Sequence, residues 1–235
     1  GKTCEILIFL IGAMTIVEII DYFNGFATIK QFIKTNKKRT LLWIMCILAF
    51  ILSAIIDNLT ATIVLITILR KLIAENKDRI WFAGLIIIAA NAGGAYSPFG
   101  DITTLMVWQA GIVEFFTFFN IFIPSVVNYV IPAAIMYFFI PNESPAVSSD
   151  RVSMKRGGRM IIFLGLFTIF SAVNFHNILH LPPMLGMMFG LGLLGLYSYY
   201  LKITFNPENE DNKFDFFKKI SRAEWDTLLF FFGVI

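Results

Sequence analysis

Two short polar motifs lie inside long apolar runs of this sequence, and each contains an aspartate. The first motif is Asp57-Asn58-Leu59-Thr60, and the second extends from Asn91 to Thr104 and contains Asp101. An ionised side chain at the centre of a bilayer costs at least about 2.5–3.5 kcal/mol, so such residues usually mark an ion or proton pathway. Carboxylate, amide and hydroxyl oxygens are the ligands that hard cations prefer. We therefore interpret the following residues as a cation- and proton-binding site: Asp57, Asn58, Thr60, Asn91, Asp101, Thr103 and Thr104.

These residues also have a structural interpretation, which the sequence leaves open. An aspartate at the start of a helix accepts hydrogen bonds from the first free N–H groups and is favoured by the helix dipole. Serine or asparagine would cap a helix without the cost of a buried charge, which favours the ion-site interpretation for Asp57 and Asp101. The neutral candidates are as typical of helix caps as of ligands, and Tyr96 and Ser97 are interpreted as packing residues.

Two further acidic residues, Glu18 and Asp21, lie three positions apart near the end of the first apolar segment. This spacing places them on one face of a helix. They are candidates for a proton relay, and the alternative is that both side chains simply reach out to the membrane surface.

The composition indicates a membrane protein. Hydrophobic residues make up 57% of the chain and charged residues 15%, whereas soluble domains have roughly 25% charged residues. The two cysteines are isolated, so they predict neither a disulfide framework nor a metal site. Apolar segments that span a bilayer, or nearly do so, occur at residues 6–23, 118–140, 160–175 and 184–201.

The basic residues predict how the chain crosses the membrane. All lysines and arginines except Lys2 fall into four clusters, at residues 30–39, 70–79, 151–159 and 202–222. Short loops rich in Lys and Arg lie on the cytoplasmic side, so we expect all four clusters there. The 30 residues between Arg39 and Arg70 are too few for two spans of about 20 residues each. The sequence therefore predicts a re-entrant hairpin of two half-helices at residues 40–69, with Asp57–Thr60 at its tip.

The next predicted crossing, at residues 80–113, is too long for one straight helix. Three glycines and a proline lie between Asn91 and Asp101, and both residue types weaken a helix. We therefore expect a broken transmembrane helix that is unwound from Asn91 to Asp101, followed by a returning helix at residues 118–140.

An internal repeat is indicated by two segments that align without gaps, Glu5–Gly12 and Asp226–Gly233. Chance similarity between apolar helices is the alternative explanation. Inverted repeats are common in secondary transporters. The expected organisation is the end of a first repeat at residues 1–140, a cytoplasmic loop at 141–159, and the truncated start of a second repeat at 160–235. We expect the chain to be a fragment of a longer protein.

The sequence resembles the NhaD-type sodium/proton antiporters of the ion transporter superfamily. The resemblance rests on three motifs, Gly12–Asp21, Asp57–Thr62 and Asn91–Thr104. It implies a polytopic helical bundle in which the hairpin tip faces the helix break, with Asp57 and Asp101 as sodium ligands. It also implies that the full site is built from both repeats.

The leading functional hypothesis is exchange of sodium or lithium for protons by a multi-pass protein of the inner (plasma) membrane. The expected partners are the lipid bilayer and the exchanged ions, with no nucleic acid; the assembly state, including a homodimer, stays open. No enzymatic activity and no cofactor are expected, because the sodium ion and the proton are substrates. The alternatives are an anion or dicarboxylate transporter of the same superfamily, an inactive fragment, and an intramembrane aspartyl protease, which Phe99-Gly100-Asp101 faintly resembles.

Overall fold

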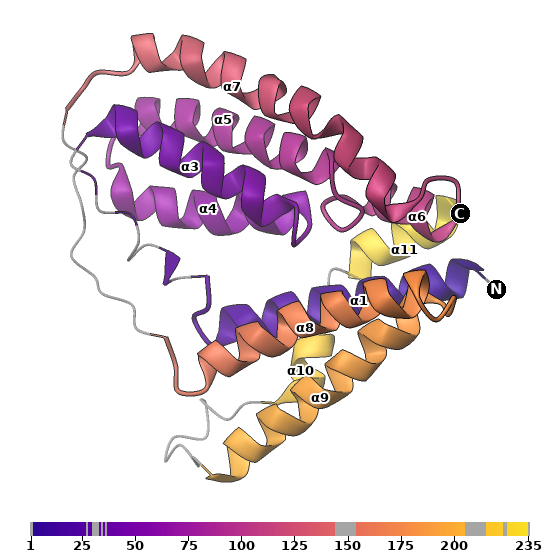
Figure 1. Cartoon of the computed structure of the whole chain (residues 1–235). Coiled ribbons are helices and arrows are strands. Elements are labelled where there is room, and N and C mark those ends of the chain that lie inside the picture. Colours follow the sequence, from indigo (N-terminus) through magenta and orange to yellow (C-terminus); the bar gives the residue numbers. More distant parts are fainter. Residues whose placement is uncertain are drawn as a thin grey trace. The chain divides into compact units, whose positions relative to one another are not determined.

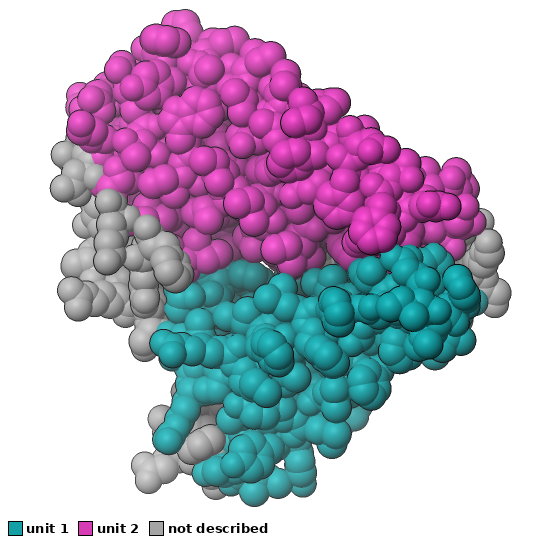
Figure 2. Space-filling model, in the orientation of Figure 1, with its two compact units in different colours: residues 1–28, 152–235 teal, residues 29–151 magenta. Residues whose placement is uncertain are grey.

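The computed structural model describes residues 2–26, 28, 29, 33, 35, 37–143, 154–204, 215–222 and 225–234. All regular secondary structure in these residues is helical (Figure 1), which confirms the prediction of an all-α protein. The chain forms two compact units (Figure 2). Unit 1 consists of residues 1–28 and 152–235, and unit 2 consists of residues 29–151.

Three helical segments among the described residues are long and apolar enough to cross a membrane, judged by length and composition: Phe115–Phe139, Gly158–Asn177 and Pro183–Thr204. Their large apolar side chains are often exposed, for example Phe138 and Phe170. An exposed apolar surface of this kind is stable against lipid and unfavourable in water. These segments match three of the predicted apolar runs and support a membrane protein.

In the described part of unit 2 the helices are, in chain order, α3 (Lys38–Ser53), α4 (Asn58–Leu72), α5 (Asn76–Ala95), α6 (Ile102–Gln109), the 3-10 helix η1 (Phe115–Ile121) and α7 (Phe122–Phe139). Helix α5 is central, because it packs against α3, α4 and α7. The core between these helices contains side chains with no solvent exposure, among them Leu41, Met45, Leu65 and Ile86.

Helices α3 and α4 contain 16 and 15 residues and are joined by residues 54–57. At about 1.5 Å per residue each helix is shorter than the roughly 30 Å hydrocarbon core. These lengths agree with the two half-helices expected at residues 40–69, whereas the re-entrant path through a membrane stays a prediction.

The helix break differs from the expectation. Helix α5 continues through Asn91, Gly93 and Gly94 to Ala95, so only residues 96–101 separate it from α6. The physical reason is that the glycines serve close packing: a Cβ atom at Gly93 would overlap the backbone carbonyl of Phe50 in α3. Gly93 therefore lets α3 and α5 approach closely, and α5 stays helical at Gly93 and Gly94.

In the described part of unit 1 the helices are α1 (Lys2–Tyr22), α8 (Gly158–Asn177), α9 (Pro183–Thr204), α10 (Phe216–Ile220) and α11 (Trp225–Val234). Helices α8 and α9 form an antiparallel pair, and α1 packs against both. Gly186 makes this pair close, since a Cβ there would lie 2.6 Å from the backbone of Ala172. Parts of the predicted cytoplasmic loops, including Lys30, Lys34, Arg151 and Lys213, lie outside the described residues.

Candidate functional site

Asp57 is the N-cap of α4, and its carboxylate is turned toward its own helix. The backbone N–H of Thr60 donates to Asp57 Oδ1 over 2.8 Å, and the Thr60 hydroxyl donates to Oδ2 over 2.5 Å. Asp57 is half-buried at the hairpin tip. Both carboxylate oxygens therefore take part in the capping geometry that the sequence left open as an alternative.

Asp101 is the N-cap of α6, and its two oxygens have different partners. Oδ1 accepts from the backbone N–H and from the hydroxyl of Thr103, both at 2.8 Å. Oδ2 accepts instead from the side-chain amide of Asn58, at 2.9 Å. One oxygen of Asp101 therefore caps a helix, while the other faces the hairpin tip.

Asn58 connects the hairpin to both sides of the helix break. Its Nδ2 donates to Asp101 Oδ2 and also to Asn91 Oδ1, at 3.0 Å. The Asn91 amide is oriented in turn by its own Nδ2, which donates to the carbonyl of Ile87 over 2.8 Å. The structure thus brings together Asn58, Asn91 and Asp101, which come from the start of α4, the last part of α5 and the residue before α6.

The backbones of the hairpin tip and the break are also joined directly. The N–H of Asn58 donates to the carbonyl of Gly100 over 3.0 Å, and the hydroxyl of Ser97 donates to the carbonyl of Ala54 over 2.6 Å. Gly100 lies so close to the hairpin that a Cβ there would be 2.5 Å from the Ser53 carbonyl oxygen. Only glycine fits at this contact.

Thr104 takes part in the break but uses its hydroxyl proton on the backbone. Its Oγ1 lies 2.8 Å from the Asp101 carbonyl and 2.9 Å from the Ser97 carbonyl. This geometry stabilises the turn before α6. Of the seven predicted ligands, Asp57 and Thr60 form one local pair, while Thr103 and Thr104 support the Asp101 side of the break.

Four helix ends meet at the site: the C-terminal ends of α3 and α5 and the N-terminal ends of α4 and α6. The last carbonyls of a helix carry partial negative charge and the first N–H groups partial positive charge. The two aspartates already occupy the two N-terminal ends. Both are acidic, and the sequence contains no Lys or Arg within residues 40–69 or 80–150.

The site is not a typical transition-metal centre. No group of three or more His, Cys, Asp or Glu side chains that could hold a metal ion occurs in the described residues. The donors at the break are two amides, a carboxylate and hydroxyls, a set that suits a hard monovalent cation better than zinc or copper.

The proposed relay residues, Glu18 and Asp21, belong to unit 1. Glu18 forms an ion pair with Lys219 of α10 at 3.8 Å. The Lys219 ammonium also lies 4.6 Å from the ring centre of Tyr22, and the Lys155 ammonium lies 3.7 Å from the same ring. The structure therefore gives Glu18 a local ionic partner, and the relay stays a prediction.

The sequence interpretation missed two residues at the break. Ser53 is fully buried, and its Oγ has no hydrogen-bond partner in the described structure. This oxygen lies close to the end of α5, because a Cβ atom at Gly94 would be 3.3 Å from it. Ser97 was interpreted as a packing residue, yet its hydroxyl bonds the hairpin. A signal for Ser53 existed in the sequence, since it is a polar residue five positions before Asn58 in an apolar helix.

Lys38 belongs to a basic cluster that the sequence predicts on the cytoplasmic side, and the sequence analysis did not predict its burial. Its side chain is 6% exposed and lies 2.7 Å from Asp78, 3.4 Å from Glu143 and 3.6 Å from Glu75. The ion-pair group ties the starts of α3 and α5 to the residues that follow α7. The sequence gives no local sign of this ion-pair group, because Glu143 lies 105 positions from Lys38 along the chain.

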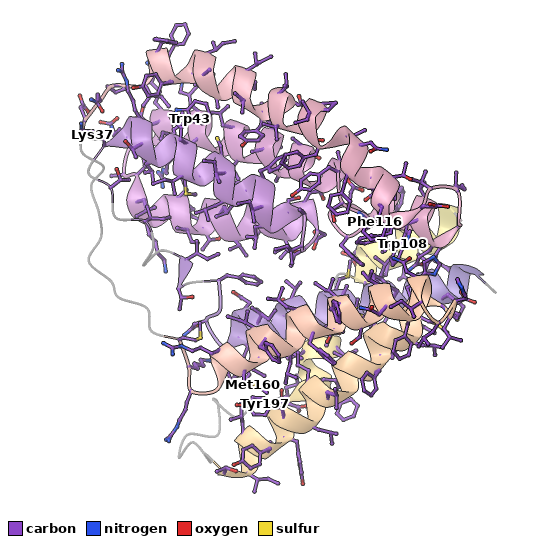
Figure 3. All side chains as sticks on the ribbon, viewed as in Figure 1. Lys37, Trp43, Trp108, Phe116, Met160 and Tyr197 are labelled. Atoms are coloured by element: carbon purple, nitrogen blue, oxygen red, sulfur yellow. The ribbon has the colours of Figure 1, made fainter. Side chains whose placement is uncertain are left out.

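The aromatic side chains form a continuous contact chain around the break. Tyr96 stacks on Phe50 at 4.9 Å between ring centres, and Phe99 meets Trp108 edge-on at 5.4 Å. Figure 3 shows Trp108 and Phe116 in the same region beside α6. Tyr96 is thus a packing residue, as its sequence context predicted.

Comparison with known proteins finds transporters, the class of protein that the sequence motifs indicate. The family model described as "Citrate transporter" matches residues 3–235. The chain is 42% identical over 254 residues to "Na(+)/H(+) antiporter NhaD" of Vibrio parahaemolyticus, covering 98% of this chain and 61% of that protein. It is 36% identical over 242 residues to "Sodium/proton antiporter 1" of Arabidopsis thaliana, covering 100% of this chain and 41% of that protein. No solved structure matches.

These matches confirm the resemblance to NhaD-type antiporters. The chain spans less than two thirds of the length of the curated relatives it matches.

Proposed function

Because the chain belongs to the citrate transporter family, we propose that the protein containing it exchanges sodium or lithium ions for protons across a membrane. Members of a transporter family move solutes and are not enzymes. The choice of ions is supported by the relatives named as sodium/proton antiporters. The single observation that carries the proposal is the meeting of Asn58, Asn91 and Asp101 at the helix break.

The arrangement of these three residues suits a cation. The NH2 group of Asn58 lies between two acceptor oxygens, Asn91 Oδ1 and Asp101 Oδ2. A partially positive group thus occupies the space where a cation would be attracted. If the Asn58 amide turns over, its own oxygen joins the other two, and three oxygens face one point. The buried hydroxyl of Ser53 is a further oxygen close to the break.

Coupling to protons follows from competition at Asp101. A protonated carboxyl has lost the charge that attracts the cation, and a bound cation disfavours the proton. A rise in pH therefore favours cation binding, and each turnover exchanges one species for the other when the site opens to one side at a time. The role of Asp57 in this proposal is to add a second negative charge at the hairpin tip.

A citrate substrate, which the description of the matching family names, is less compatible with this site, and so is a dicarboxylate. An anion would bind at half-helix N-termini, where N–H groups and the dipole attract negative charge. At α4 and α6 those N-termini are capped by Asp57 and Asp101. Two carboxylates would repel a third, and no lysine or arginine is near in the sequence to compensate.

An aspartyl protease needs two carboxylates that share one water molecule. Both oxygens of Asp57 bond to Thr60, and Asp101 bonds to Asn58 and Thr103. The two side chains are thus held by different partners, which does not support the protease alternative.

We place the protein in the inner (plasma) membrane as a multi-pass protein that contacts lipid, with a homodimer as its proposed assembly.

The test measures sodium-, lithium- and citrate-dependent proton movement in everted membrane vesicles that contain the full-length protein. Asp101→Asn should abolish sodium-dependent proton movement, because asparagine still caps a helix but carries no charge. Asp215→Asn is the matched control, since Asp215 caps α10 in the same way, accepting from the Phe217 N–H at 3.0 Å. Normal sodium exchange in D101N, or proton movement driven by citrate alone, would contradict the proposal.

A further inference from the structure

Ser97 lies in the turn between α5 and α6, and its hydroxyl has partners on both sides. The residue is 6% exposed. Its Oγ donates to the Ala54 carbonyl in the hairpin loop at 2.6 Å and accepts from the Phe99 backbone N–H at 3.2 Å. One hydroxyl therefore uses its donor on the hairpin and an acceptor lone pair on the break itself.

The backbone carbonyl of Ser97 is also engaged, in the direction of α6. It accepts from the Thr104 hydroxyl at 2.9 Å and from the Gly100 N–H at 3.3 Å. Ser97 thus connects the hairpin loop, the turn and the first helical turn of α6.

A second bond crosses the same interface in the opposite direction, from the Asn58 N–H to the Gly100 carbonyl. Between the two crossing bonds the backbones of the hairpin and the turn touch, because a Cβ on Gly100 would lie 2.5 Å from the Ser53 carbonyl oxygen. The backbone of Asn58 is therefore fixed relative to the turn. From this backbone position its side chain reaches Asp101 and Asn91.

From this geometry we infer that Ser97 is a positioning residue for cation exchange: its hydroxyl holds the hairpin tip in the alignment that places Asn58 between Asn91 and Asp101. Ser97 itself bonds none of these three side chains through its hydroxyl. The inference rests on the proposed function for its kinetic consequence, whereas the alignment it describes is a property of the fold.

The kinetic test compares Ser97→Ala with Ser198→Ala in everted vesicles. Ser198 is also buried, and its hydroxyl donates to the Leu194 carbonyl of its own helix at 2.7 Å, so it is a matched loss of one buried hydrogen bond. S97A should raise the KM for sodium about three- to tenfold with kcat within about twofold, because one hydrogen bond is lost from the alignment. Ser97→Cys, with its weaker donor, should have an intermediate KM.

A structural readout is independent of transport. Amide hydrogen exchange followed by mass spectrometry should show faster exchange in S97A for the peptide that contains Asn58, whose N–H bonds to Gly100. S198A should leave that peptide unchanged. Unchanged exchange in S97A would overturn the inference, as would an unchanged KM or an equal rise of KM in S198A. If the unsubstituted protein moves no protons with sodium, the proposed function fails, and the hydrogen exchange alone then decides on Ser97.

Discussion

The side-chain amide of Asn58 donates to the carboxylate of Asp101 over 2.9 Å, although the two residues lie 43 positions apart in the chain. This contact joins the tip of one helix pair to the break of another helix. It is also specific in chemistry, because an amide offers both a donor and an acceptor to its neighbours. The first prediction follows from that property.

Replacement of Asn58 by Ala should weaken apparent sodium affinity by about tenfold or more, since the amide that faces both Asn91 and Asp101 is removed. Initial rates of proton movement against sodium concentration give the affinity. Asn174→Ala is the control, because Asn174 is a half-buried asparagine whose amide donates to the carbonyl of Phe170 in its own helix. Unchanged sodium affinity in N58A would mean that the amide does not belong to the cation site.

Two glycines in α5 should respond in opposite ways to alanine. At Gly93 the new Cβ overlaps the Phe50 carbonyl, so G93A should destabilise the protein by about 1–3 kcal/mol. At Gly84 nothing lies within 4 Å of the Cβ position, so G84A should stabilise the helix by up to about 1 kcal/mol. Thermal unfolding of the purified protein in detergent measures both, and equal effects would contradict the close α3–α5 contact.

Lys38→Met should be strongly destabilising, because the buried carboxylate of Asp78 then loses its ammonium partner. Removal of one partner from a buried ion pair typically costs about 3–5 kcal/mol. The double variant K38M/D78L should recover much of this loss, since no unpaired charge remains. Lys37→Met, at the exposed neighbouring position, serves as the control in the same unfolding measurement. A loss in K37M as large as in K38M would show that the buried ion pairs are not the cause.

Docking of α10 onto α1 should depend on pH through Lys219. Burial, together with the nearby Arg222, lowers the pKa of Lys219 from its ordinary value of 10.5, although Glu18 and Asp21 oppose this. The docked state therefore holds fewer protons than an undocked state with an ordinary lysine. Docking should strengthen as pH rises from below the lowered pKa toward 10.5, and change no further above it.

NMR titration of 13C-methylated lysines in the purified protein measures this effect. The signal of Lys219 should titrate below the ordinary lysine value of 10.5. Assignment is made by loss of the signal in K219R. A Lys219 midpoint at or above 10.5 would contradict the buried position of its ammonium.

The lengths of the hairpin helices could be predicted from sequence, because the basic residues at Arg39 and Arg70 bound a segment too short for two spans. The start of the helix break could not. Glycine both weakens a helix and permits close packing, and only the carbonyl of Phe50 decides between these roles at Gly93. The same holds for Ser97, whose partner Ala54 lies 43 positions away.

The site shows a similar division. The residue types and the two motifs predict Asn58, Asn91 and Asp101 as candidates, and the structure brings these three together. The sequence does not show which way each carboxylate points. For Asp57 it therefore left both a helix cap and an ion ligand open, and the structure turns this carboxylate toward Thr60. The burial of Lys38 was missed because it depends on Glu75 and Asp78 at the start of α5 and on Glu143 after α7.

The contact of Gly93 with Phe50 also limits how unit 2 can move. When one helix slides along another, their side chains must pass one another. Here the backbone of α3 at Phe50 fills the space that a side chain at Gly93 of α5 would occupy. A shift of α3 along α5 that brought a residue with a Cβ to the place of Gly93 would press that atom against the Phe50 carbonyl. The contact at Gly93 therefore opposes sliding of α3 along α5 in that direction.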